Sequence, residues 1–143
     1  MEVPRGIRNN NPLNIRKTPA KWFGKVEGKD PEFETFDTME HGIRAAYMIV
    51  RTYLTTRGCK TIADIVRRWA PPGDHNDTYH YIRRVGKYIR LDVTTPTCFE
   101  NCLLMARLLH AMHIVENGNN FIPIAKFIYV YNFYFRGAHS DGL

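Results

Sequence analysis

Apolar side chains recur at helical spacing in five stretches of this sequence, and turn-forming residues separate the stretches. Each stretch begins near a residue that can cap a helix or ends near a glycine or proline that cannot continue one. Asp37 and Glu40, for example, have the spacing of a capping box at the start of 39–56. The predicted helices are 39–56, 62–69, 78–89, 97–118 and 123–135; the last could also form a pair of strands, because its aromatic residues are dense. The pattern therefore predicts a mainly α fold.

The first 37 residues lack this helical spacing. Residues 5–24 are expected to form an asparagine-rich loop, since asparagine favours turns and Pro12 restricts the residue before it. Residues 24–37 could hold a short β-hairpin whose inward side chains are Val26, Phe33 and Phe36. Taken together, residues 1–143 are expected to form one α+β domain of about five helices with a small hairpin region, and the chain is too short for a second domain.

The predicted helix 97–118 carries the most informative candidate residue. Thr97 and Glu100 have the spacing of a capping box, and Asn117-Gly118 can supply a left-handed stop. Glu116 would then lie at the carboxyl end of an apolar helix, where unpaired carbonyls disfavour a negative charge. A glutamate in this position is more often a solvated surface residue. If its surroundings are apolar, however, it stays protonated near neutral pH and can act as a general acid in glycoside cleavage.

Charge and cysteine content narrow the possible partners and compartments. The net charge of +6 and the pI of 9.4 favour acidic polymers, which include nucleic acid, anionic membranes and the bacterial wall. Three cysteines are an odd number, and Cys98 and Cys102 lie four apart on one predicted helix, so reduced core thiols are expected. The sequence shows neither the apolar run of a secretory signal nor the roughly 20 apolar residues of a membrane span.

Several motifs resemble those of a family of small phage and prophage proteins, often labelled virion or structural proteins, that looks related to lysozyme-like peptidoglycan hydrolases. The resemblance covers about residues 5–118. It is carried by Arg5-Gly6-Ile7-Arg8-Asn9-Asn10-Asn11-Pro12-Leu13-Asn14-Ile15-Arg16, Trp22-x-Gly24, Phe33-x-x-Phe36, Gly42-Ile43-Arg44-Ala45, Trp69-Ala70-Pro71-Pro72, Asn76-Asp77-Thr78-x-x-Tyr81 and Glu116-Asn117-Gly118. It implies a lysozyme-like domain.

A second resemblance is to the glucosaminidase class of autolysins, in which an Asn-Asn-x-x-x-Ile loop precedes a helix that opens with Thr-Asp-x-x-Tyr. Residues 10–15 and 76–81 echo these two features. In lysozyme-like enzymes, however, the catalytic glutamate ends a helix that precedes the asparagine loop, and only residues 1–7 precede it here. Either the domain has lost its acid, or a circular permutation has moved the acid-bearing helix to the other end. Glu116-Asn117-Gly118 looks like the Glu-Ser-Gly that ends this helix in lytic transglycosylases.

The resemblance implies cleavage of the β-1,4 glycan strand of bacterial peptidoglycan, with Glu116 as the acid and no cofactor. Glu34 or Asp37 would be the second carboxylate of a hydrolase; without one, a group of the substrate completes a lytic transglycosylase reaction. The candidate substrate-binding residues are Asn10, Asn11, Asn14, Arg16, Trp69, Tyr79 and Tyr81. The expected protein is a monomer that is made in the bacterial cytoplasm and acts on the wall after release or as part of a virion.

Three alternatives stay open. A non-catalytic wall-binding or virion structural protein of the same fold would keep a sugar-binding cleft but would not cleave the glycan strand. His110, His113 and Glu116 are spaced so that they could share a helix face and hold a metal, although the HExxH arrangement is absent. Nucleic-acid binding rests on net charge and on a basic helix face with no recognised motif, formed by Arg83, Arg84, Lys87 and Arg90.

Overall fold

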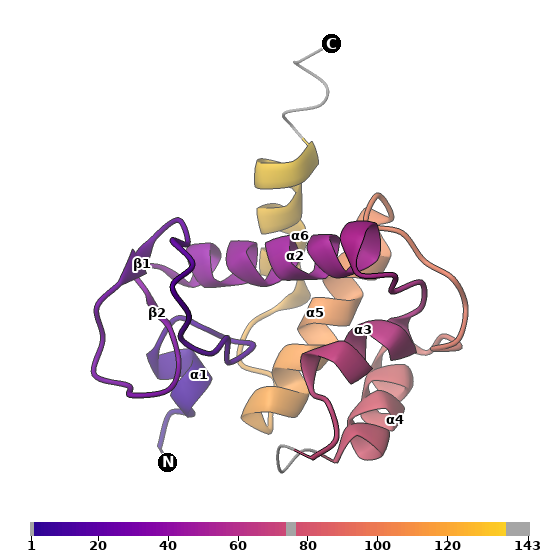
Figure 1. The fold of residues 1–143 in the computed structure, drawn as a ribbon, viewed down its shortest axis with the longest axis horizontal. Coiled ribbons are helices and arrows are strands. Elements are labelled where there is room, and N and C mark those ends of the chain that lie inside the picture. The colour runs from indigo at the N-terminus through magenta and orange to yellow at the C-terminus, as the bar shows by residue number, and fades with distance from the viewer. Residues whose placement is uncertain (1, 74–76, 137–143) are drawn as a thin grey trace.

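A small β-hairpin and several helices surround one central helix, α5, in the computed structural model, which describes residues 2–73 and 77–136 (Figure 1). Helix α5 contacts α1, α2, α4 and α6. The described elements are α1 (Arg5–Arg8), β1 (Lys25–Val26), β2 (Thr35–Phe36), α2 (Met39–Thr56), α3 (Ile62–Trp69), α4 (Thr78–Ile89), α5 (Cys102–Asn117), α6 (Ile124–Tyr131) and a π-helical turn, η1 (Asn132–Arg136). The mainly helical α+β prediction is confirmed.

Local sequence signals account for the boundaries of three helices. Helices α2, α3 and α4 span the predicted residues. Thr61 and Asp64 form a reciprocal capping box at the start of α3, and the Asp77 side chain accepts the backbone N–H of His80 at the start of α4. Residues 124–136 are helical, so the strand alternative for this segment is wrong.

Two predicted caps are wrong. Helix α5 begins at Cys102 rather than Thr97, and the Asn101 side chain caps it by accepting the N–H of Leu104 at 3.2 Å. Thr97 instead donates its backbone N–H to the Lys60 carbonyl (2.8 Å), because the preceding segment is held beside the start of α3. At α2 the cap is Thr38, whereas the Asp37 carboxylate contacts the ring of His41 at 2.5 Å.

The hairpin predicted within residues 24–37 is confirmed, but the N-terminal region differs from the prediction in two details. Residues Arg5–Arg8 form one helical turn. The two strands pair antiparallel, with Lys25 opposite Phe36 and Val26 opposite Thr35. Neighbouring residues of a strand face opposite sides, so this register buries Phe36 and leaves Val26 42% exposed, contrary to the inward position predicted for Val26.

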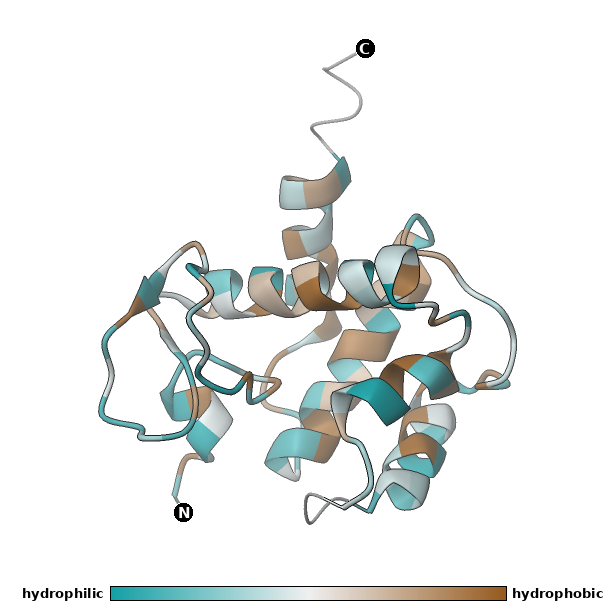
Figure 2. Cartoon of the chain, in the orientation of Figure 1, coloured by the Kyte–Doolittle hydropathy of each residue, from teal (hydrophilic) through white to brown (hydrophobic). Residues whose placement is uncertain are grey.

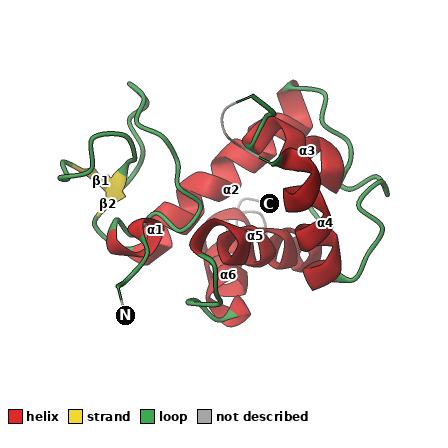
Figure 3. Cartoon of the chain, turned by 90° about the horizontal axis from the view of Figure 1, so that it is seen from below, coloured by secondary structure: helices red, strands yellow, loops and turns green. Residues whose placement is uncertain are grey.

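The core forms where α5 meets the surrounding helices, and hydrophobic positions, brown in Figure 2, recur along these helices. Four fully buried side chains of α5, Met105, Leu108, Leu109 and Met112, pack at its centre. Seen from below, α3 and α4 lie on the opposite side of α2 from the hairpin (Figure 3).

The structure shows how exposed the three cysteines are and whether any described helix could span a membrane. All three cysteines are free thiols; Cys59 is buried, Cys102 is half-buried and Cys98 is exposed, so the prediction that Cys98 lies in the core is wrong. Within residues 2–73 and 77–136, no helix has both the length and the apolar character that crossing a bilayer requires.

Candidate active site

The asparagine-rich turn folds back onto α2 and the carboxyl end of α5. Asn10 and Asn14 both adopt positive φ angles, 51° and 54°, a region that asparagine tolerates better than most residues. The backbone carbonyl of Asn10 lies against Gly42 of α2, where a Cβ would be 1.9 Å from its oxygen. The Asn117 amide donates to the Pro12 carbonyl at 2.8 Å, which ties the turn to α5. These contacts hold Asn14 beside the end of α5.

Glu116 is clamped between this turn and helix α4. Asn14 Nδ2 donates to Glu116 Oε1 at 2.9 Å, and the hydroxyl of Tyr81 donates to Oε2 at 3.0 Å. Tyr81 is only 8% exposed. The glutamate therefore does not extend into open solvent, and the structure brings together three of the residues selected from the sequence, from three separate segments.

Burial and hydrogen bonding act in opposite directions on Glu116. Burial raises the pKa of the Glu116 carboxyl, because the apolar surroundings disfavour its charged form, while the Asn14 and Tyr81 donors and the nearby Arg16 partly offset this. Burial also raises the pKa of Tyr81 well above its usual value, so this hydroxyl stays a donor. The site can thus hold a protonated acid and also stabilise the carboxylate left after proton transfer.

Glu116 opens onto a cleft of about 340 Å³. Its walls combine one carboxylate, Glu116, with polar and aromatic side chains that can hydrogen-bond to sugar hydroxyls and stack on sugar rings. The lining residues that could make these contacts are Asn14, Arg16, Thr18, Trp22, Phe33, Tyr53 and Trp69. Of the predicted binding residues, Asn14, Arg16 and Trp69 line this cleft.

The other predicted binding residues have different surroundings. The Asn11 side chain is fully buried and makes three hydrogen bonds with the backbone of Ile15 and Glu34. Asn10 Nδ2 donates to the Phe36 carbonyl at 3.0 Å. Both amides are thus used to shape the turn. Tyr79 is 66% exposed on α4 and does not line the cleft. Asn76 of the sequence motif lies outside the described residues.

Neither candidate second carboxylate lines the cleft. Glu34 is 1% exposed, forms an ion pair with Lys25 Nζ at 3.0 Å and accepts the backbone N–H of Thr18 at 3.3 Å. The Asp37 carboxylate pairs with His41, which lowers its pKa. Among the described residues that line the cleft, Glu116 is thus the single acid.

Sequence reasoning missed three aromatic residues of the cleft. Trp22, Phe33 and Tyr53 line the cleft but are absent from the predicted binding residues. Phe33 lies beneath two guanidinium groups, with Arg5 Cζ at 4.4 Å and Arg16 Cζ at 5.3 Å from its ring centroid. The Trp22-x-Gly24 and Phe33-x-x-Phe36 motifs were available as a signal, but helical or strand periodicity does not mark either residue.

His113 has a structural role that occupies both of its ring nitrogens. Nε2 accepts the backbone N–H groups of Phe121 (3.1 Å) and Ile122 (3.2 Å), so Nδ1 carries the proton and donates it to the His110 carbonyl at 2.6 Å. Neither nitrogen is left for a metal. In the part of the chain that the structure describes, no three His, Cys, Asp or Glu residues are grouped as metal ligands would be.

The neutral His113 predicts a loss of stability in acid. Burial lowers the pKa of His113 from 6.5 to about 4. Below pH 6.5 the unfolded chain therefore binds more protons at this position than the folded chain does, and the free energy of unfolding falls as pH falls, by about 2 kcal/mol between pH 7 and pH 5. Urea unfolding at several pH values measures this slope. His113→Gln should remove this contribution to the slope.

A second prediction concerns the donor from α4. Tyr81→Phe removes a hydrogen bond that stabilises the Glu116 carboxylate, so the pKa of Glu116 should rise further, by about one unit. NMR titration of the Glu116 carboxyl measures this rise. Tyr88→Phe, on an exposed part of the same helix, serves as the control and should leave the Glu116 pKa unchanged. An unchanged pKa in Tyr81→Phe would contradict a role for this hydroxyl.

One curated relative places the chain among phage proteins. Protein P5 of Pseudoalteromonas phage PM2 is 40% identical to it over 130 residues, covering 83% of this chain and 74% of the relative. No model of a known protein family matches the sequence. Identity of this extent over most of both proteins shows common ancestry, and the chain therefore belongs to the family of the phage Protein P5.

Proposed function

We propose that this protein cleaves the β-1,4 glycan strand of bacterial peptidoglycan, with Glu116 as the general acid. The observation that carries the proposal is the Glu116 carboxyl, which opens onto an aromatic-lined cleft and whose pKa burial raises. A protonated acid beside a cleft that can bind sugars is what glycosidic bond cleavage requires. The similarity to a phage protein supports a need to cross or digest a bacterial wall.

In the proposed reaction, Glu116 donates its proton to the glycosidic oxygen as the bond to the sugar breaks. The resulting carboxylate is stabilised by Asn14 and Tyr81, which already donate to its two oxygens. These two bonds favour the charged product of proton transfer over the neutral acid. Asn14 and Tyr81 are therefore positioning residues, because they act through Glu116.

A reaction with one protein carboxylate agrees best with the lining of the cleft. Glu34 and Asp37 are paired elsewhere, with Lys25 and His41. The positive charge that develops on the sugar would then be quenched by a group of the substrate itself, either its N-acetyl oxygen or its 6-hydroxyl group. The second of these transfers its proton to the Glu116 carboxylate and gives a 1,6-anhydro product, as in a lytic transglycosylase.

A lysozyme-like origin with a permuted chain order accounts for the position of the acid. Helix α5 follows the asparagine turn in the sequence, yet its end contacts this turn through Asn117 and Glu116. In the proposed ancestor the equivalent helix would lead directly into the turn. The protein would act on the wall as part of a phage particle or after release from the infected cell.

Product analysis tests this function. Purified sacculi are incubated with the protein, and the soluble fragments are separated and identified by mass spectrometry. Release of disaccharide fragments with 1,6-anhydro ends supports a single-acid transglycosylase, and release of reducing ends identifies a hydrolase. If the protein sediments with sacculi but releases neither product, it is a wall-binding module and the enzymatic proposal fails.

A further inference from the structure

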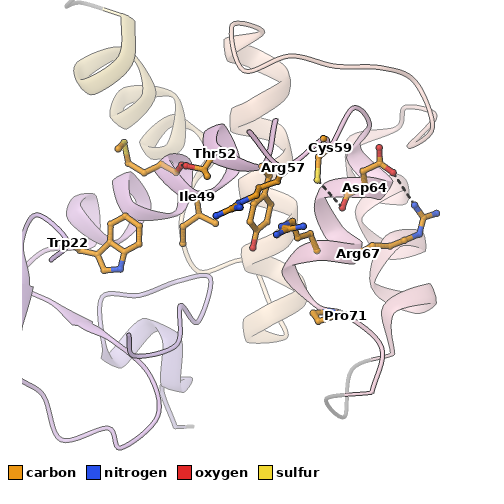
Figure 4. A pocket seen from close by; sticks show the side chains of 12 residues that line it. Trp22, Ile49, Thr52, Arg57, Cys59, Asp64, Arg67 and Pro71 are labelled. Atoms are coloured by element: carbon orange, nitrogen blue, oxygen red, sulfur yellow. Dashed lines mark hydrogen bonds and ion pairs between the residues drawn. The ribbon is translucent and has the colours of Figure 1, made fainter. Parts of the chain in front are cut away.

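A second, larger groove lies beside the Glu116 cleft and is not used by the proposed reaction. It has a volume of about 930 Å³ and runs between α2 and α3 (Figure 4). Trp22, Ile49 and Tyr53 line both the groove and the cleft, so the two hollows are adjacent. In Figure 4, Trp22 and Ile49 lie at one end of the groove and Asp64 and Arg67 at the other, with Arg57 between them. A molecule bound at Glu116 could extend into this space.

The groove is rich in guanidinium groups. Its described lining contains three arginines, Arg57, Arg67 and Arg68, and a single acid, Asp64. The arginines come from the carboxyl ends of α2 and α3, where a positive charge is favourable for each helix by itself. The fold brings both of these helix ends to the same groove.

Asp64 leaves most of this positive charge uncompensated. Its Oδ2 accepts the backbone N–H groups of Lys60 (3.0 Å) and Thr61 (3.2 Å), and its Oδ1 contacts Arg67 at 3.3 Å. The Arg68 guanidinium lies 5.3 Å from the ring centroid of Tyr53. Within the described part of the chain, no carboxylate pairs with Arg57 or Arg68. These two side chains are therefore available to an anionic ligand.

We propose that this arginine-lined groove binds the carboxylates of the peptide branch of peptidoglycan while the glycan strand lies in the Glu116 cleft. Guanidinium groups pair with planar carboxylates through parallel hydrogen bonds, and Trp22, Met48 and Ile49 offer apolar contacts to short side chains of the peptide. The branch leaves the strand at every second sugar, so a groove adjacent to the cleft is within its reach. This inference rests on the proposed function, since it assigns the substrate branch bound beside that same site.

The test compares two substrates with the same glycan strand. Intact sacculi carry the peptides, whereas strands treated with an amidase have lost them and keep only the lactyl carboxylate. The double variant Arg57→Gln with Arg68→Gln should lower the ratio of kcat/KM on peptide-bearing to stripped strands by about tenfold, through lost charge-assisted hydrogen bonds. Arg84→Gln with Lys87→Gln, which removes the same charge from the exposed face of α4, should leave the wild-type ratio unchanged.

The outcomes separate the inference from the proposed function. If wild type cleaves neither substrate, the function fails and the inference with it. If wild type cleaves both and the double variant keeps the wild-type ratio, only the inference is overturned. Equal losses on both substrates would also overturn it, because the arginines would then act on the glycan strand that both substrates share. Cosedimentation of the Glu116→Gln form with intact sacculi, with and without the two arginine substitutions, adds a binding readout that needs no turnover; binding should weaken when the arginines are replaced.

Discussion

Glu116→Gln should lower the cleavage of peptidoglycan strands by about 10²- to 10⁴-fold, which is the usual contribution of a positioned general acid. The substitution keeps the shape of the side chain. Its amide oxygen can still accept from Asn14, and its NH₂ group can donate to the Tyr81 oxygen. What is lost is the transferable proton. Release of soluble fragments from purified sacculi, measured at several enzyme concentrations, gives the rate.

Stability separates this loss of activity from misfolding. Because burial raises the pKa of Glu116, the folded state holds the proton more tightly than the unfolded state does. The free energy of unfolding therefore falls as pH rises from about 4.5 through the raised pKa, and the charged carboxylate is a cost above it. The neutral glutamine avoids this cost, so the variant should be at least as stable as wild type at pH 7. Glu100→Gln, on the exposed surface, is the matched control and should keep full activity; wild-type activity in Glu116→Gln would remove this residue from the mechanism.

Gly42→Ala should destabilise the fold and displace the asparagine turn. In the middle of a helix, alanine is favoured over glycine by about 1 kcal/mol. Here the added Cβ would lie 1.9 Å from the Asn10 carbonyl oxygen. That carbonyl cannot simply rotate away, since the Asn10 side chain is bonded to Phe36 and the Asn11 side chain is buried. Overpacking of this kind should outweigh the propensity gain, for a net loss of about 2 kcal/mol.

Thermal and urea unfolding measure the effect of Gly42→Ala, with an expected drop in the thermal midpoint of about 5 °C or more. Activity should fall as well, because Asn14 belongs to the displaced turn. Gly86→Ala in α4 is the matched control. A Cβ there would meet only the end of the Val93 side chain at 3.0 Å, in a loop that can adjust, so its stability should stay within about 1 kcal/mol of wild type. Equal stability of the Gly42→Ala and Gly86→Ala variants would show that the turn does not pack closely against Gly42 of α2.

Most helix boundaries could be read from the sequence, because they depend on neighbouring residues. The capping box of Thr61 and Asp64 and the left-handed Gly118 act over three or four positions. The two failures at helix starts, Thr97 and Asp37, have a common cause. Each has the right spacing, but the backbone N–H of each donates to a carbonyl of another segment, that of Lys60 for Thr97 and that of Gly24 for Asp37. A rival residue, Asn101 or Thr38, then provides the cap.

Only part of the candidate site could be predicted from the sequence, because contacts between distant segments decide the rest. Asparagines 10, 11 and 14 look alike in the sequence, but their side chains have different partners. Asn11 is buried and bonds to the backbone of the turn, Asn10 bonds to the hairpin, and Asn14 contacts Glu116. The segments that pack against the turn determine which asparagine reaches Glu116. Trp22 and Tyr53 were missed because a cleft has no periodicity along the chain. Its lining comes from separate elements that meet only when the domain is folded.

The sequence by itself determined the mainly helical class, the extents of α2, α3 and α4, and the location of Glu116 at the end of an apolar helix. Hydrophobic period and capping are short-range effects, so the local sequence is sufficient for them. Only the tertiary structure decided what Glu116 faces. Its contact with Asn14 spans 102 residues of chain, and its burial depends on the packing of α4 and α5 against the N-terminal turn. Burial and donor geometry set the proton affinity of the carboxyl, and both are properties of the folded packing rather than of any local segment.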